Sequence, residues 1–389
     1  MLTYPMNQRD EKSKYYYLYT AIKEDILSGT LKKNEKLPSK RSLAEHLGIS
    51  LITVETAYQM LKDEGYIESR ERSGYFVTEL IPVVKEKREQ RTLKLLEDEF
   101  KGNQSYKSQQ DQSEESIFYR NVESEYVEMN SSSAKNLFPE SLYFKTIRSV
   151  LSEYGSKLLE KSPNEGCTIL RNAIAKYLLR YRGIFAQPEQ IIIGSGAEHL
   201  YNAVVRMLGN DVIYGIENPS YSQIRKVYEG MGATCELLQM GAEGINTEEL
   251  ENTQAKVLHV TPFHSYPSGV TATVRKRQEY LEWAKKNGGM IVEDDFDSEF
   301  FMPGKPIDTL YMTDHNQSVI YINTFSKSLS SSIRIGYMIL PERLLEKYKE
   351  TMGEFSCTVP VLDQYVLAEF IERGHFEQHL NRVRRHRME

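Results

Sequence analysis

The chain has 389 residues, of which 40% are hydrophobic and 27% are charged, a composition typical of a soluble globular protein with about two or three domains. The three cysteines are scattered, so we expect neither disulfides nor a metal site. The sequence has no N-terminal signal core and no apolar run of the about 18 residues that span a bilayer, so we expect a cytoplasmic protein without a membrane anchor. The net charge of -6 argues against a nucleic-acid surface that extends over the whole chain, although a local basic patch is compatible with it.

Residues 11–80 begin with two stretches whose apolar residues recur at helical spacing. The first covers residues 17–27 and ends before Gly29. The second lies between Ser39, a residue type that caps helix N-termini, and Gly48, a residue type that ends helices. A third helix is predicted over residues 51–64, after a short turn.

Two β-like runs follow, residues 66–69 and 75–78, and a hairpin is predicted from them. Helix, helix, turn, helix and hairpin is the outline of a winged helix-turn-helix. In such a unit the third helix enters the major groove, and the hairpin contacts the DNA backbone or the minor groove. The alternative is a small helical subdomain that binds no nucleic acid.

Charge alone does not decide between these alternatives. Residues 11–80 contain eleven Lys and Arg residues and eleven Asp and Glu residues, so their net charge is zero. Basic residues nevertheless stand where groove-facing elements begin or turn, which makes them candidates for DNA contacts: Lys40, Arg41, Arg70 and Arg72.

The sequence LPSKRSLAEHLGIS…TVETAYQMLKDEGYIESRERSGYFV closely resembles the GntR-type winged helix over nearly this whole segment. The resemblance implies that Arg41, Ser50 and Thr53 contact DNA from the second and third helices. It also implies that Arg72 and Gly74 contact DNA from the wing. A double-stranded DNA operator is therefore the expected partner.

Because of two departures from the GntR pattern, the operator sequence of this protein cannot be inferred from those of the family. Leu51 stands where the family usually has an arginine, and Glu55 stands where a further basic residue is frequent. Loss of a guanidinium changes sequence preference or weakens binding, whereas Leu51 is able to contact a thymine methyl group.

Residues 81–116 are charged, rich in Gln and Ser and poor in apolar residues, so they are predicted to form a flexible linker. A tether suits a switch because it lets a DNA-binding unit change its position, and a plain spacer is the alternative. The remaining residues, 117–389, form the large domain. Its predicted strands alternate with helices, which indicates an α/β fold with a mainly parallel, doubly wound sheet.

Three segments of the large domain have the pattern of ligand-binding turns. The strand at residues 191–193 runs into Gly194-Ser195-Gly196-Ala197-Glu198 and then a helix, a geometry that binds phosphate, with a tight turn as the alternative. Asp294 follows a buried strand, where α/β sheets bind ligands. Lys327 lies in a Ser-rich loop between two apolar runs and is suited to a Schiff base with an aldehyde, although such a lysine is more often a surface residue.

In this order and spacing, the segments resemble a fold-type I aminotransferase, of the aspartate aminotransferase class, from about Asn136 to the end of the chain. The resemblance implies pyridoxal 5'-phosphate (PLP) as the cofactor, with Lys327 forming the internal aldimine and Asp294 pairing with the pyridinium nitrogen. It implies further cofactor contacts from Tyr221, which would stack on the ring, from His264, which would lie near the 3-oxygen, and from the phosphate-binding residues Ser195, Gly196, Ala197, Thr324 and Arg334.

The chain also departs from the aminotransferase pattern. Phe296 replaces the tyrosine that these proteins usually place two or three residues after the aspartate, so a hydrogen bond to the 3-oxygen is missing. Ser265 and Tyr266 replace an amide side chain. The resemblance implies a C-terminal small domain that carries the arginine binding a substrate carboxylate, and we expect this domain to be absent or truncated in this sequence. Nothing in the sequence supports Arg382, Arg384 or Arg385 as a substitute for that arginine.

The fusion of a GntR-type winged helix with an aminotransferase-like domain resembles the MocR-type transcription regulators. The resemblance implies a homodimer in which PLP, with an amino acid or amine as effector, changes the arrangement of the DNA-binding units. A PLP-dependent aminotransferase with an appended winged helix, and a DNA-binding protein whose PLP site is inactive, are the alternatives. Enzymatic turnover, the effector and the direction of regulation are left open by the sequence.

Overall fold

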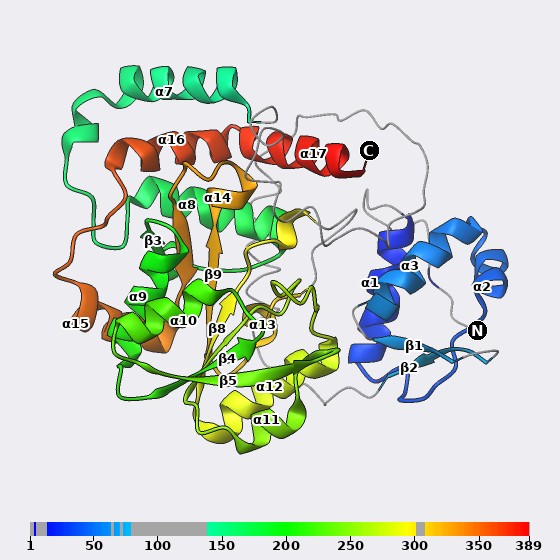
Figure 1. Cartoon of the computed structure of the whole chain (residues 1–389). Helices are drawn as coiled ribbons and strands as arrows, with labels where there is room; N and C mark the ends of the chain where they lie inside the picture. Colours follow the sequence, from blue (N-terminus) through cyan, green and yellow to red (C-terminus); the bar gives the residue numbers. More distant parts are fainter. Residues whose placement is uncertain are drawn as a thin grey trace.

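The computed structural model describes Tyr4 and residues 14–63, 66–70, 73–78, 138–300 and 308–388. The predicted linker and the wing residue Arg72 lie outside these ranges. Figure 1 shows the described residues as a small N-terminal unit in blue beside a larger α/β domain in green to red. Among the described residues, no helix combines the length and the apolar character needed to cross a bilayer.

The N-terminal unit has the predicted order of elements, and the winged helix-turn-helix fold is confirmed. Ser39 caps the second helix, since its Oγ accepts a hydrogen bond of 3.2 Å from the backbone N–H of Ser42. Gly48 ends that helix with φ of 63°. Leu18, Val54 and Tyr58 are fully buried where the helices meet. The elements are α1 (Lys14–Leu27), α2 (Lys40–Leu47), α3 (Leu51–Asp63), β1 (Ile67–Arg70) and β2 (Gly74–Val77).

The larger domain is built on one eight-stranded sheet with the order β3-β10-β9-β8-β7-β4-β5-β6. The central pairs from β9 to β5 are parallel, whereas β10 is antiparallel to both of its neighbours. The predicted, mainly parallel sheet is thus confirmed. The strands are β3 (Ile191–Gly194), β4 (Ile213–Asn218), β5 (Thr234–Gly241), β6 (Gly244–Ile245), β7 (Val257–Val260), β8 (Met290–Asp294), β9 (Val319–Thr324) and β10 (Gly336–Ile339).

Two apolar clusters cover the two faces of this sheet. Successive strand residues alternate between them: Ile191 and Ile193 belong to one cluster and Ile192 to the other. Such two-sided burial requires helices on both faces, as in doubly wound folds. The first cluster includes residues of α8 (Thr168–Tyr177), α12 (Val274–Asn287), α13 (Leu310–Thr313), α16 (Val361–Glu372) and α17 (His375–Met388), and the second includes residues of α9 (Ala197–Leu208), α10 (Ser222–Gly230) and α15 (Leu345–Met352).

The sequence places Lys327 in a loop, and this prediction was wrong. Lys327 lies in a helical turn, α14 (Phe325–Ser328), directly after β9. The backbone N–H of Phe325 donates to Ile335 O at 2.9 Å, which ties the start of this turn to the segment before β10. A lysine on a tied helical turn is held in one position, as a site residue must be.

The winged-helix unit contacts the larger domain through α1. Lys23 Nζ lies 2.5 Å from Asp308 Oδ2, donates to Tyr19 Oη at 3.0 Å and stands 5.0 Å from the centre of the Tyr66 ring. Val274, at the start of α12, packs in the apolar cluster of the winged-helix unit. The winged-helix unit therefore packs on the larger domain through the ion pair of Lys23, whose side chain lies beside two aromatic rings, and through the apolar contact of Val274.

Lys23→Met tests this contact, because methionine keeps the aliphatic stem between the rings but removes the charge that pairs with Asp308. We expect the free energy of unfolding to fall by about 1 kcal/mol, since the pair is only partly buried. Small-angle scattering should show a larger radius of gyration as the two units separate. The control is Lys62→Met on the exposed side of α3. Equal radii for both variants would contradict the proposed seating.

Candidate functional site

The predicted phosphate-binding turn lies where β3 ends and α9 begins. Gly196 precedes α9 with φ of 90°, so the first backbone N–H groups of the helix are directed at the site. A Cβ atom on Gly196 would lie 3.0 Å from Arg334 Nη2 and 3.2 Å from its Cζ. The guanidinium of Arg334 thus lies against the backbone of Gly196, and a residue with a Cβ atom would not fit between them.

The other predicted phosphate contacts lie on neighbouring elements. Ser195 Oγ accepts a hydrogen bond of 3.0 Å from Thr358 Oγ1. Thr324 ends β9 and pairs in register with Gly336 of β10, two residues after Arg334. Since β10 also pairs with β3, the antiparallel strand brings Arg334 and Thr324 to the same edge as Ser195 and Gly196.

Asp294 is the buried carboxylate at the end of β8. The hydroxyl of Tyr201 donates to Asp294 Oδ2, and His259 Nε2 lies 3.6 Å from the same oxygen. His259 Nδ1 is in turn 2.7 Å from Tyr228 Oη. Burial, followed by the nearby charge of Asp294, raises the pKa of Tyr201 well above its ordinary value, so this phenol stays protonated as a donor.

The second oxygen of Asp294 is available for a ligand. Asp294 Oδ1 is buried and has no hydrogen-bond partner in the described structure. A buried carboxylate oxygen without a partner is costly, and a protonated ring nitrogen would satisfy it. This orphan oxygen and the glycine turn against Arg334 are the two features that fit PLP.

Lys327 is directed at a second carboxylate, Asp297. Lys327 Nζ lies 2.8 Å from Asp297 Oδ1 and 4.6 Å from the centre of the Phe296 ring. Asp297 Oδ2 lies 3.1 Å from His264 Nδ1. The side chain of Lys327 is 22% exposed and that of Asp297 is 1% exposed, so the lysine is open to a ligand while its counter-ion is buried.

Two tyrosines with partly exposed rings complete this set. Tyr221 is 46% exposed and Tyr266 is 38% exposed, and their ring centres lie 6.4 Å apart in an edge-on arrangement. Exposed aromatic rings in a pair are suited to stacking on a planar ligand. The structure describes all the predicted cofactor-site residues, and their roles toward PLP stay predictions.

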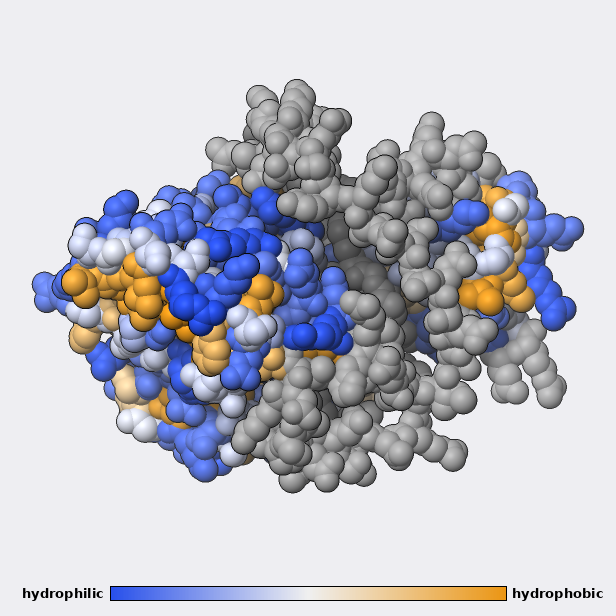
Figure 2. Space-filling view, turned by 90° about the horizontal axis from the view of Figure 1, so that it is seen from above, coloured by the Kyte–Doolittle hydropathy of each residue, from blue (hydrophilic) through white to orange (hydrophobic). Residues whose placement is uncertain are grey.

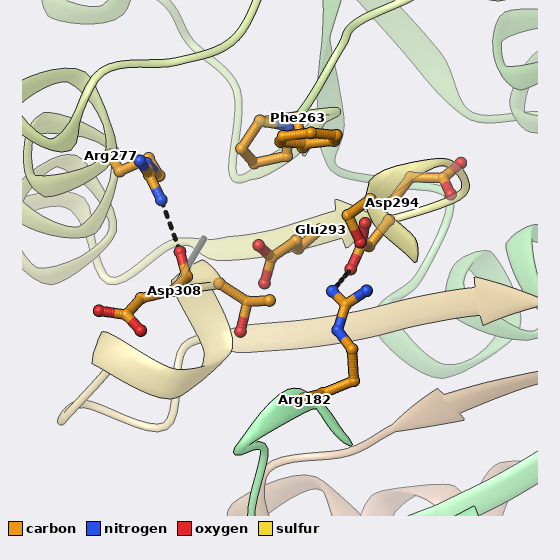
Figure 3. Close-up of a pocket in the computed structure, with 10 residues that line it drawn as sticks. Arg182, Phe263, Arg277, Glu293, Asp294 and Asp308 are labelled. Carbon is orange, nitrogen blue, oxygen red and sulfur yellow. Dashed lines mark hydrogen bonds and ion pairs between the residues drawn. The ribbon is translucent and has the colours of Figure 1, made fainter. Parts of the chain in front are cut away.

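A small pocket lies beside Asp294, on the side of the larger domain that carries α12 and α13 (Figure 3). Arg182 reaches into it and pairs with Asp295 at 2.5 Å, while Arg277 donates to Asp308 O at 2.6 Å. Glu293 accepts hydrogen bonds from the backbone N–H groups of Leu310 (2.7 Å) and Tyr311 (2.9 Å). Burial raises the pKa of Glu293 to about 8.

Sequence reasoning missed Tyr201, His259 and Asp297. His259 had a signal, since a histidine within the otherwise apolar strand at residues 257–260 is unusual and needs a partner. Asp297 belongs to the acidic run at residues 293–299, in which sequence reasoning gave a role to Asp294 alone. Tyr201 had no signal, because a tyrosine on an apolar helix face is ordinarily part of the core.

The candidate DNA-binding face lies on α2, α3 and the hairpin. Ser50 Oγ accepts from the backbone N–H of Thr53 at 3.2 Å and lies 2.7 Å from Thr53 Oγ1, so Ser50 caps α3. Leu51 and Ile52 are 37% and 53% exposed at the start of this helix. Apolar side chains therefore stand where the recognition helix would meet base edges.

Two candidate DNA contacts have an acidic partner in the same unit, and Arg70 is one of them, with a distance of 2.7 Å to Glu68 Oε1. Lys40 Nζ lies 3.2 Å from Glu55 Oε1, the residue that replaces a frequent basic residue of the family. Arg41 is exposed, and Gly74 has φ of 109° at the wing turn. For the described residues Arg41, Ser50, Thr53 and Gly74, direct DNA contact stays a prediction. The same holds for Lys40 and Arg70, although Glu55 and Glu68 offset part of their charge.

Comparison with known proteins agrees with this division of the chain. Residues 14–77 match the family described as bacterial regulatory proteins, gntR family, and residues 130–389 match aminotransferase class I and II. The uncharacterized HTH-type transcriptional regulator YdeL of Bacillus subtilis is 35% identical, over 95% of this chain and 76% of that protein. The probable rhizopine catabolism regulatory protein MocR of Rhizobium meliloti is 30% identical, over 95% of this chain and 73% of that protein.

Solved structures support the fold of the larger domain. The kynurenine aminotransferase of Pyrococcus horikoshii is similar with a TM-score of 0.59 and 26% identity, over 64% of this chain and 64% of that chain. The chain thus spans less than two thirds of the length of that enzyme.

Gly196→Ala tests the anion site. The added Cβ would meet the Arg334 guanidinium at a φ that is unfavourable for alanine, a strain of about 1–3 kcal/mol. We expect the affinity for PLP, measured by fluorescence titration, to fall about tenfold. The matched control is Gly230→Ala, where a Cβ would meet no atom within 4 Å. Unchanged affinity in Gly196→Ala would show that the phosphate binds elsewhere.

Proposed function

The chain belongs to the MocR-type family of HTH transcriptional regulators, and from this premise we propose that it binds PLP at Lys327 and senses an amino acid or amine there. The observation that carries the proposal is that one chain holds both a capped recognition helix and a lysine site that fits PLP. The fit rests on the unpartnered Asp294 Oδ1 and on the turn at Gly196.

In this proposal each residue has a defined task. Lys327 attaches the cofactor, and PLP supplies an electron-withdrawing ring and an aldehyde that reacts with amines. Asp294, oriented by Tyr201 and His259, would accept a hydrogen bond from the protonated ring nitrogen. Arg334 and the α9 N-terminus hold the phosphate by charge-assisted hydrogen bonds.

The proposed response is a change in DNA binding. An amine ligand alters the DNA-binding units only if it binds two arrangements of the protein with different affinity. The contact between Lys23 and Asp308 is a candidate for the contact that differs between the two arrangements. Asp308 precedes α13, and Glu293, which is next to Asp294 in sequence, accepts hydrogen bonds from the N-terminus of α13. The site and the DNA-binding unit are thus joined by a short run of contacts.

We also propose that the regulator acts in the cytoplasm as a homodimer. Phe144 and Leu151 on α7 (Glu140–Tyr154) are 45% and 51% exposed and lie seven residues apart, on one helix face. Figure 2, which views the molecule from the side of α7 in Figure 1, shows hydrophobic patches on this surface. Such patches are common where a second protein copy packs.

Lys327→Ala tests the cofactor assignment. Wild-type protein mixed with PLP should give a visible absorption band that the variant lacks, while the exposed-lysine variant Lys347→Ala keeps it. Titration with amino acids and amines should shift the wild-type band with one of them, and the shift should persist. Loss of the band with formation of a keto acid would show turnover and support the aminotransferase alternative. A band in Lys327→Ala equal to that of the wild type would refute the assignment.

Arg41→Ala tests the DNA-binding face in a gel shift with the region upstream of the protein's own gene. If Arg41 contacts a phosphate, affinity should fall for all sequences, and the slope of log affinity against log salt should decrease by about one. Arg225→Ala on the exposed side of α10 is the control. Absence of sequence-specific binding by the wild-type protein at moderate salt would count against the proposed function as a transcription regulator.

A further inference from the structure

Asp297 lies between two nitrogen atoms of the candidate site. One oxygen is 2.8 Å from Lys327 Nζ, and the other is 3.1 Å from His264 Nδ1. Its side chain is only 1% exposed, so water screens this carboxylate weakly. A buried carboxylate at hydrogen-bond distance is the group that most strongly favours the charged form of a neighbouring amine.

The neighbours of Asp297 hold this arrangement in place. Lys327 is carried by the helical turn α14, which is tied to the segment before β10. The backbone N–H of His264 donates to Thr271 Oγ1 at 3.2 Å, and His264 has a positive φ of 56°. The Phe296 ring, 4.6 Å from Lys327 Nζ, covers the lysine without offering a hydroxyl group.

We propose that Asp297 is a positioning residue that sets the protonation state of the Lys327 nitrogen, in the free protein and after the cofactor is attached. This inference rests on the proposed function only where it concerns the attached cofactor. Phe296, which precedes Asp297, has no hydroxyl group to donate, whereas the carboxylate of Asp297 lies within hydrogen-bond distance of Lys327 Nζ.

The consequence for sensing follows from charge. Free Lys327 must lose a proton to attack an aldehyde, and the carboxylate delays this loss to higher pH. If PLP were attached at this nitrogen, the same carboxylate would stabilise the protonated form of the nitrogen.

Among the described residues, the other charged or titratable groups of the candidate site are His264 after β7, Asp294 at the end of β8 with Tyr201 from α9 and His259 from β7, Tyr221 before α10, and Arg334 before β10. His264 Nδ1 lies 3.1 Å from Asp297 Oδ2, so a substitution at Asp297 changes the surroundings of His264 as well as those of Lys327. A change in the titration of Lys327 therefore includes any effect that passes through His264.

The first experiment uses the free protein and needs no cofactor. The rate of acetylation of Lys327 by acetic anhydride is measured against pH, with the labelled peptide quantified by mass spectrometry. Asp297→Asn, which keeps the side-chain shape, should shift the midpoint of this curve to lower pH by about one unit or more. Asp297→Glu, which keeps the charge, should retain most of the wild-type midpoint.

The matched control is Glu217→Gln, at the end of the neighbouring strand β4. Ser265 Oγ donates to Glu217 Oε2 at 2.7 Å, so this buried carboxyl has a hydrogen-bond partner other than Lys327. Its replacement should leave the labelling midpoint of Lys327 unchanged. Thermal melting of all variants excludes unfolding as a cause, and Asp297→Ser provides a second charge removal if Asp297→Asn does not fold.

The second experiment titrates the visible band of the PLP-loaded protein with pH. Asp297→Asn should lower the midpoint of this titration relative to wild type, in the same direction as for labelling. Equal labelling midpoints in wild type, Asp297→Asn and Asp297→Ser would overturn the inference. A labelling shift in a protein that forms no band would support the role of Asp297 at Lys327 and refute the proposed use of PLP, so the two failures are distinguishable.

Discussion

The larger domain depends on burying an acidic run at the end of one central strand. Within seven residues, β8 and the turn after it place five carboxyl groups that are each no more than 5% exposed. Burial of unpaired charge is too costly for a stable protein, so every group needs a partner from another element. The pairs are Glu293 with the backbone of Leu310 and Tyr311, Asp294 with Tyr201, Asp295 with Arg182, Asp297 with Lys327, and Glu299 with Tyr177.

These pairs fix the surroundings of the site before any ligand arrives. Asp295 and Glu299 connect β8 to the end of α8, and Glu293 holds the start of α13. Asp294 and Asp297 are left facing the ligand side. Because the strand forces successive side chains to opposite faces, the carboxylate at the ligand and the carboxylate that holds α13 are adjacent in sequence. The contact of α1 with Asp308 then lies one residue before the α13 N-cap, Thr309.

The local features could be predicted from sequence, and the long-range partners could not. Ser39 and Gly48 delimit α2 because capping depends on the neighbouring backbone, and a buried strand such as residues 191–193 follows from its apolar run. The partners of Asp297 are separated from it by about thirty residues on either side, so no local pattern connects them. The same holds for Lys23 and Asp308, whose pairing depends on how two units pack. The helical turn around Lys327 was mistaken for a loop because serine is a weak helix former.

The charges of the DNA-binding face suit the proposed regulation, in which a ligand changes how the two DNA-binding units of a dimer are arranged. Zero net charge over residues 11–80, and the pairing of Lys40 with Glu55, leave little general attraction to phosphate. Exposed Leu51 and Ile52 offer apolar contacts that discriminate bases but add little affinity at a distance. In the proposed homodimer, two such units would bind correctly spaced half-sites together, and each would add to the affinity of the other. A change in their spacing would remove the contribution of the second unit, so a modest difference in ligand affinity between two arrangements would change the occupancy of an operator.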